Sequence, residues 1–133
     1  MATDSLRVTA VIHSTPEAIF DAFLDGPTHS AMTGAGATGL PKVGAKFTAW
    51  DGYISGRQLE FARPTRIVQA WRSSEFPADA PDSRVEILFE PSARGTRVTI
   101  VHSEIPKGQG SKYRGGWKDF YFTPMKAWAL ASR

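Results

Sequence analysis

The stretch WDGYISGRQLEFARPTRIVQAWR, residues 50–72, decides the fold. It predicts two strands, and the alternation of hydrophobic and polar residues is interrupted within the first of them. In the first strand Ile54 has an even number, whereas Leu59 and Phe61 have odd numbers. Successive residues of a strand face opposite sides of a sheet, so this change would turn part of the apolar set to the wrong face. The strand must therefore contain an irregularity that returns the later hydrophobic residues to the same face as Ile54.

A β-bulge is an irregularity of this kind, because one extra residue restores a common face and bends the strand. An isolated glycine within a strand often marks such a bend, so we predict the bulge at Gly56. The sheet then curls and can wrap around one helix. The residues expected on its inner face are Ile54, Leu59, Phe61, Ile67 and Trp71.

Further strands are predicted on both sides of this stretch. Apolar alternation and turn residues place them at residues 6–13, 45–50, 53–61, 66–72, 83–92 and 96–105. The fifth of these directs Val85, Ile87 and Phe89 to one face, and the last directs His102 to the same side as Val98 and Ile100.

Helices are predicted between the first two strands and at the end of the chain. A short helix follows Ser14-Thr15-Pro16, which are favourable capping and first-turn residues, and one more helical turn is possible in residues 27–34. Residues 106–116 are glycine-rich and predict a loop, at the end of which the first turn of a helix is possible. From Trp117 to Arg133 one apolar stripe predicts a long helix, and Pro124 within it predicts a kink; the stripe comprises Trp117, Phe120, Tyr121, Pro124, Met125 and Trp128.

Length and composition indicate one α+β domain over residues 1–133. The net charge of +3 is spread without a run of like charges, so nucleic-acid binding is not favoured. The chain has no cysteine, which excludes disulfides and thiolate chemistry. No signal peptide and no apolar segment of about 18 residues is apparent, so we expect a cytoplasmic protein without a membrane span.

Five motifs follow one another along the chain: STPEAIFDAF (14–23), GAKFTAWDGYISGRQLEF (44–61), PTRIVQAWR (64–72), GTRVTIVHSEIP (95–106) and GWKDFYFTPMKAWAL (116–130). This ordered set resembles the Aha1-type domains (activator of Hsp90 ATPase homologue, C-terminal type) of the START-like, or SRPBCC, superfamily. The resemblance implies the helix-grip (START-like/Bet v 1-like) fold: a curved six-stranded antiparallel sheet around a long C-terminal helix, with short helices between the first two strands.

Three functions are compatible with this reading. START-like relatives bind lipids, sterols, polyketides or hormones between sheet and helix, so the first is binding of a small, mostly apolar ligand. In that function His102 and Tyr121 are candidate polar anchors; the predicted ligand-binding residues are Ile54, Phe61, Trp71, Phe89, His102, Trp117, Tyr121 and Met125. The second is modulation of an Hsp90-type ATPase. The third is a pocket enzyme, for which no convincing acid–base pair exists.

A partner chaperone has a candidate docking surface in the basic residues Lys112, Arg114 and Lys118 near the start of the last helix. The histidines lie far apart in sequence and share no metal-ligand spacing, so we predict no metal and no cofactor. Edge strands permit a monomer or a homodimer.

Overall fold

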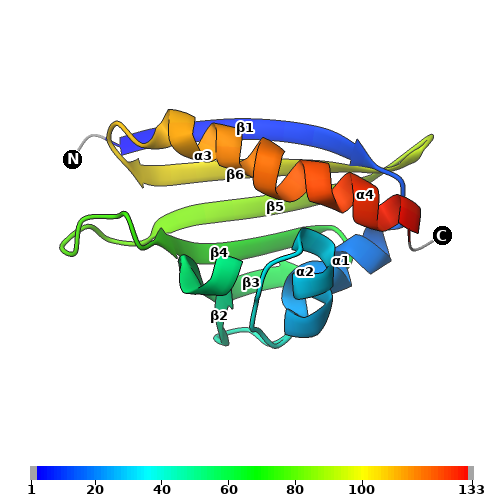
Figure 1. Cartoon of the computed structure of the whole chain (residues 1–133), viewed down its shortest axis with the longest axis horizontal. Coiled ribbons are helices and arrows are strands. Elements are labelled where there is room, and N and C mark those ends of the chain that lie inside the picture. The colour runs from blue at the N-terminus through cyan, green and yellow to red at the C-terminus, as the bar shows by residue number, and fades with distance from the viewer. Residues whose placement is uncertain (1–2, 132–133) are drawn as a thin grey trace.

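The computed structural model describes residues 3–131, in which six antiparallel strands form one curved sheet with the helices gathered on one of its faces (Figure 1). The spatial order of the strands is β1-β6-β5-β4-β3-β2. The predicted helix-grip architecture is confirmed. The strands are β1 (Thr3–Ile12), β2 (Lys46–Ala49), β3 (Ile54–Ala62), β4 (Arg66–Ser73), β5 (Ser83–Ser92) and β6 (Gly95–Pro106).

Two short helices, α1 (Pro16–Leu24) and α2 (Gly26–Thr33), connect β1 to the loop before β2. Asp25 separates them because its extended backbone ends α1, while its carboxylate accepts a hydrogen bond of 3.0 Å from the Thr28 amide and so caps α2. The single helical turn expected at residues 27–34 is thus a complete helix.

The C-terminal helix runs through α3 (Gly110–Trp117), η2 (Lys118–Phe122) and α4 (Thr123–Ala131). It begins at Gly110, where the sequence predicted a loop, because the Asp4 carboxylate of β1 accepts hydrogen bonds from the Gly108 and Gly110 amides at 2.9 and 3.0 Å. This contact joins residues far apart in sequence, so local composition could not reveal it. The predicted end at Arg133 lies outside the described residues.

The segment η2 is a π-helical turn, in which the Thr123 amide donates to the carbonyl of Lys118. A π-turn contains one residue more than an α-turn, and it rotates the following side chains by about 100° relative to a regular helix. The turn directly precedes Pro124, which lacks the amide that a regular helix would need there. As a result Phe122 is buried and Phe120 is 55% exposed, so the predicted stripe was wrong in placing Phe120 on the buried face.

The β-bulge is present, but at Leu59 and not at Gly56. In the β3–β4 ladder Gln58 pairs with Gln69 and Glu60 pairs with Val68, so Leu59 is the extra residue. Its side chain is 43% exposed, and the prediction that it joins the inner face was wrong. The parity argument detected the bulge, but a bulge displaces its own residue from the face that it restores.

Gly56 instead permits a close approach within the sheet. A Cβ atom on Gly56 would lie 2.0 Å from the carbonyl oxygen of Ala70 and 2.7 Å from the ring of Phe47. Gly56 is also the partner of Trp71 in the ladder. The missing side chain therefore lets two large rings pack beside one backbone position.

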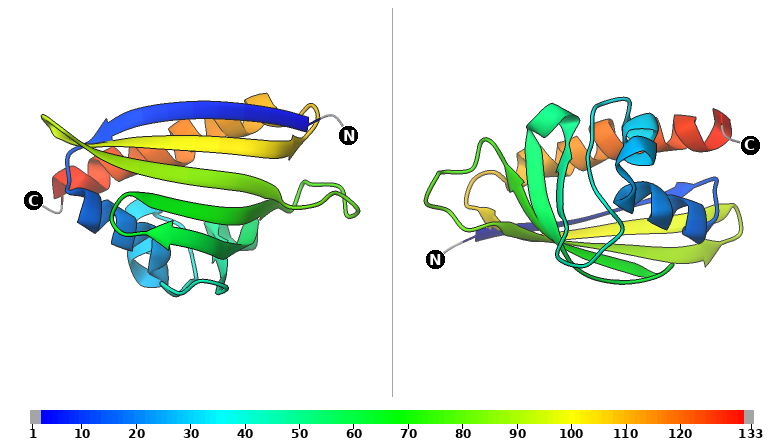
Figure 2. Two further views of the ribbon diagram at one scale, coloured as in Figure 1. Left: turned by 180° about the vertical axis from the view of Figure 1, so that it is seen from behind. Right: turned by 90° about the horizontal axis from the view of Figure 1, so that it is seen from below.

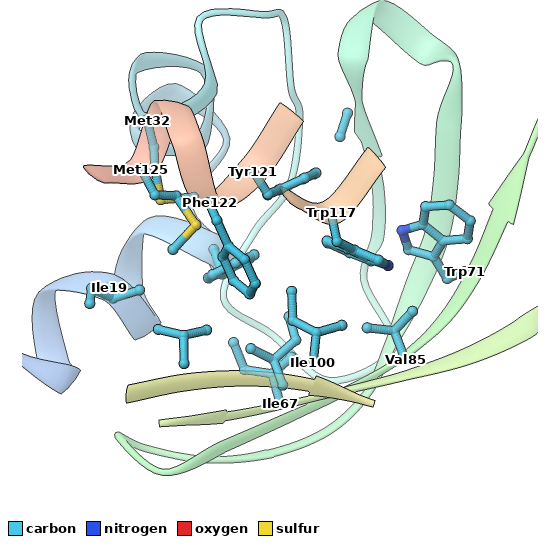
Figure 3. Packing of buried hydrophobic residues seen from close by; sticks show 14 of the residues in the cluster. Ile19, Met32, Ile67, Trp71, Val85, Ile100, Trp117, Tyr121, Phe122 and Met125 are labelled. Carbon is cyan, nitrogen blue, oxygen red and sulfur yellow. The ribbon is translucent and has the colours of Figure 1, made fainter. Parts of the chain in front are cut away.

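The curl of the sheet carries its β2–β3 end upward beside the C-terminal helix (Figure 2). The chain turns at this end in the 3₁₀ turn η1 (Trp50–Gly52), which contains the Asp51-Gly52 pair that predicted a turn here. Side chains between the sheet and helix form the core. Trp117 and Phe122 point from the helix toward Val85 and Ile100 of the sheet, and Met125 lies beside Met32 of α2 (Figure 3). Within residues 3–131 we find no helix whose length and hydropathy suit a membrane crossing.

Candidate ligand-binding cavity

A cavity of about 340 Å³ lies between the upturned end of the sheet and the C-terminal helix, and it opens to solvent. Ligand pockets commonly have volumes of about 300–1,000 Å³, and a dry cavity of about 150 Å³ accommodates benzene. The space therefore suits a molecule of about two rings. Its walls are Trp50, Tyr53, Ile54, Trp71, Tyr113, Gly116, Trp117, Phe120 and Tyr121.

The helix wall follows from helical spacing, since Tyr113, Trp117 and Tyr121 recur every four residues on one face. Gly116 lies between them and contributes no side chain. A Cβ atom on Gly116 would meet only Phe120, at 4.0 Å, which is ordinary contact. The glycine therefore leaves part of the cavity empty, and a larger residue there would fill it.

The indole of Trp117 is held by a buried chain of hydrogen bonds. Its Nε1–H donates to Nδ1 of His102 at 3.1 Å, so the proton of the neutral imidazole lies on Nε2, which donates to Oγ of Ser83 at 2.8 Å. The Ser83 hydroxyl in turn donates to the carbonyl of Trp71 at 2.7 Å. Burial lowers the pKa of His102 to about 3. This chain joins the helix wall to the sheet wall.

The hydroxyl of Tyr121 is held by a second histidine, which the sequence analysis did not select. His29 of α2 donates from Nδ1 to the carbonyl of Phe23 at 3.2 Å, and its Nε2 accepts from the Tyr121 hydroxyl at 2.9 Å. Burial lowers the pKa of His29 and raises that of Tyr121. The bond spans 92 residues of sequence, so no local pattern predicts it.

Glu75 in the β4–β5 loop holds the wall residue Tyr53 and the helix α3 together. Its carboxylate accepts hydrogen bonds from the Tyr53 hydroxyl and, at 2.8 Å, from Nζ of Lys112. The hydrogen bond from Lys112, followed by that from Tyr53, lowers the pKa of Glu75. Burial, followed by the bond to Glu75, raises the pKa of Tyr53 to about 12. These contacts tie the loop, the start of β3 and α3 together beside the cavity.

The backbone of the turn η1, which contributes Trp50 to the cavity wall, is strained. Trp50 and Asp51 have φ angles of 52° and 57°, in the left-handed region that few non-glycine residues adopt. Asp51 is fixed by two hydrogen bonds with Gly36, each of 2.9 Å: its amide donates to the Gly36 carbonyl, and its carboxylate accepts from the Gly36 amide. These bonds maintain the turn and place Trp50 against Phe120, with ring centroids 5.2 Å apart.

The predicted ligand-binding residues divide into two groups. Ile54, Trp71, Trp117 and Tyr121 line the cavity. The others lie behind it or farther away: Phe89 and Met125 are in the buried core, Phe61 packs on Phe20, and His102 lies beneath Trp71 with both ring nitrogens bonded to protein groups.

Several wall residues were missed for identifiable reasons. Tyr113 and Gly116 fell in the predicted loop, because the start of the helix depends on Asp4. Trp50 and Tyr53 flank the turn signal, which predicts a turn but not the direction of its side chains. Phe120 was in the predicted stripe, and it reaches the cavity from the edge of the helix.

The candidate docking residues do not form one compact patch. Lys112 turns toward Glu75, while Arg114 lies on the other side of α3 and donates to the Arg7 carbonyl of β1 at 3.3 Å. Lys118 follows Arg114 by one helical turn. Only Arg114 and Lys118 therefore share a face of the helix. Across residues 3–131 we find no cluster of three or more side chains suited to bind a metal ion.

A family model described as Activator of Hsp90 ATPase homolog 1-like protein matches residues 13–129. The chain is 28% identical over 117 residues to an activator of 90 kDa heat shock protein ATPase homolog from Dictyostelium discoideum, a match that covers 87% of this chain and 30% of that protein. The chain spans between 30% and 40% of the length of the curated relatives that it matches.

Solved structures share the fold over nearly the whole chain. An HSP90 activator from Plasmodium falciparum superposes with a TM-score of 0.80 at 26% identity, covering 92% of this chain and 94% of that one. A protein from Mesorhizobium loti has a TM-score of 0.80 at 20% identity, with 98% and 99% of the two chains covered. At that lower identity the likeness concerns the fold alone.

Proposed function

Because the chain belongs to the Activator of Hsp90 ATPase homolog 1-like family, we propose a function that this fold can perform within one chain: binding of a small, mostly apolar ligand between sheet and helix. One observation carries the proposal, namely an open cavity of about 340 Å³ whose walls are aromatic except at Ile54 and Gly116. Such walls bury flat apolar surface efficiently, since aromatic contacts contribute about 0.5–1.5 kcal/mol each beyond their area.

The polar groups of the helix wall support the same function. Trp117 donates its indole N–H to His102, and Tyr121 donates its hydroxyl to His29. These donors are engaged within the protein, so the rings present their apolar faces to the cavity. No wall residue carries a formal charge, which favours a neutral ligand because an unpaired charge is costly to remove from water.

The Ser83–His102 pair gives little support to a hydrolytic function. A general base must accept the proton of the serine. Nε2 of His102 cannot do so, because it already carries the imidazole proton while Nδ1 accepts a hydrogen bond from the Trp117 indole. The low pKa of His102, about 3, also makes its imidazole a weak base. We therefore assign the pair a structural role in holding the walls.

Two glycine variants test ligand binding. Gly116→Leu places a side chain in the cavity, whereas Gly115→Leu changes a neighbouring helical glycine that does not line it. Both replacements favour the helix by up to about 1 kcal/mol. The neutral fluorophore N-phenyl-1-naphthylamine serves as probe, and its emission rises in an apolar site.

We expect the wild type and Gly115→Leu to bind the probe equally, and Gly116→Leu to bind it at least tenfold more weakly. Native mass spectrometry of freshly purified protein would in addition detect any molecule that co-purifies in the cavity. Equal binding by all three proteins would place the probe elsewhere and contradict the proposal, as would the absence of binding to the wild type.

A second candidate function is modulation of an Hsp90-type ATPase. It is favoured by the likeness to the Plasmodium falciparum HSP90 activator, whose matched chain is covered to 94%. Addition of the protein to an Hsp90 ATPase assay should then raise turnover, and Arg114→Glu with Lys118→Glu should weaken the effect most at low salt. Absence of stimulation at every salt concentration would count against this function.

A further inference from the structure

The indole of Trp50 combines two costly features at the wall of the cavity. The residue has a left-handed φ of 52°, a backbone conformation that is strained for so bulky a side chain. Its Nε1–H is buried and, among the residues that the structure describes, has no hydrogen-bond acceptor. A buried donor without an acceptor is destabilising because it has lost its hydration without gaining a partner, so such groups are rare and require an explanation.

Four other donors of the wall differ from Trp50 in this respect. Trp117 donates to His102, Tyr121 to His29, Tyr53 to Glu75, and Tyr113 to Gln109. Every one of these donors therefore has an acceptor within the protein. The indole N–H of Trp50 is available for an acceptor that comes from outside.

Phe120 is a neighbour of the Trp50 ring that can move when a ligand enters. Its ring packs against the Trp50 ring in a T-shaped arrangement, with centroids 5.2 Å apart, and 55% of the residue is exposed. A side chain with so much exposed surface changes rotamer at little cost. A ligand can therefore displace the Phe120 ring and take its place beside the indole.

We infer that the cavity takes a flat aromatic ligand that bears a neutral acceptor oxygen, such as an aryl ketone, and that this oxygen accepts a hydrogen bond from Trp50. This inference rests on the proposed function and specifies its ligand class. The aromatic body fits the rings of Trp71, Trp117 and Tyr121. A neutral oxygen is favoured over a carboxylate because the cavity wall supplies no cation to pair with a charge.

Matched probes test the acceptor. 2-Acetylnaphthalene and 2-isopropenylnaphthalene have nearly the same shape, but only the ketone has an acceptor oxygen; 2-naphthoate has a similar ring system and a charge. Calorimetric titration of the full chain should show the ketone binding roughly three- to tenfold more tightly than the hydrocarbon, as one hydrogen bond predicts. The carboxylate should bind more weakly than either.

Trp50→Phe should abolish the preference for the ketone and leave the affinity for the hydrocarbon within roughly twofold. Trp128→Phe is the matched control, because Trp128 packs against the core without lining the cavity, and it should keep the preference. Infrared spectroscopy gives a readout that needs no variant. The carbonyl stretch of the bound ketone should move to lower wavenumber than in cyclohexane.

The outcomes separate the two proposals. If both neutral probes bind equally and the carbonyl band is unshifted, the role of Trp50 is overturned while ligand binding stands. If Trp50→Phe keeps the preference for the ketone, the acceptor is held by another group and the inference is again overturned. If neither neutral probe binds, the proposed function fails together with it.

Discussion

Trp117 and His102 are joined across the interior by a hydrogen bond of 3.1 Å from indole Nε1 to imidazole Nδ1, which fixes the helix wall of the cavity to the sheet. Both residues are buried. A buried acceptor that loses its donor retains the full cost of its lost hydration. Removing one partner should therefore lower the free energy of unfolding by more than the net contribution of the hydrogen bond.

Trp117→Phe should lower the free energy of unfolding by about 1–3 kcal/mol or more, because Nδ1 of His102 loses its donor and the smaller ring leaves space. Urea denaturation measures the change. Trp128→Phe, at a partly buried position, should cost clearly less. Equal losses for the two variants would show that the loss reflects ring size and not the hydrogen bond.

Acidification should destabilise the protein below a pH of about 6.5. The folded pKa of His102 is lowered to about 3 from 6.5, and that of His29 is also lowered, so the unfolded chain binds more protons in this range. The stabilisation is complete above pH 6.5 and falls as the pH drops. For His102 the loss between pH 7 and pH 4.5 should be roughly 2–3 kcal/mol.

Carboxylates whose pKa is lowered do not explain that window. The pKa values of Asp21 and Asp25 are lowered from 3.8 and that of Glu75 from 4.5, so their contributions are lost chiefly below a pH of about 4.5. Urea titrations at pH 7, 6 and 4.5 provide the stability curve. Proton NMR of the His102 ring should show no titration while the protein stays folded. A ring that titrates near pH 6.5 in the folded protein would contradict the assignment.

The sequence predicted the fold well because its signals are local. Alternation, turn residues and capping residues act within a few positions, and each strand and short helix was found near its place. The bulge was detected for the same reason, since parity is a property of neighbouring residues. The position of the bulge could not be predicted, because an extra residue at Leu59 or at Gly56 explains the change of parity equally well. Only the pairing with β4 distinguishes the two positions.

The site was only partly predictable because its geometry depends on distant contacts. The early start of the C-terminal helix needs Asp4, and the orientation of Tyr121 needs His29. The strained turn at Trp50 is held by Gly36. Residues recognised by hydrophobic spacing, such as Trp71 and Trp117, were found. Tyr113, Gly116 and Trp50 were not, because their positions depend on the distant contacts of Asp4 and Gly36.

Alanine at two glycines should have opposite effects. Gly56→Ala should destabilise the protein by more than about 2 kcal/mol, because its Cβ would lie 2.0 Å from the Ala70 carbonyl and 2.7 Å from the Phe47 ring. Gly116→Ala should be neutral or stabilising by up to about 1 kcal/mol, since it lies in a helix with space around it. Thermal unfolding of both variants measures the two changes in stability. If Gly56→Ala does not destabilise the protein, the neighbouring strands separate easily at this position.

The π-turn makes a further prediction about two neighbouring phenylalanines. Phe122 is buried and Phe120 is 55% exposed, although a regular helix with the predicted stripe would bury Phe120. Phe122→Ala should therefore cost about 3–5 kcal/mol, as buried phenylalanines do, whereas Phe120→Ala should cost less than about 1 kcal/mol. Urea denaturation distinguishes the two arrangements directly, because a regular helix through Pro124 reverses the order of the two losses. If Phe120→Ala proves the more destabilising, the π-turn is absent in solution, and the Phe120 ring that packs against Trp50 belongs to the core instead of the cavity wall.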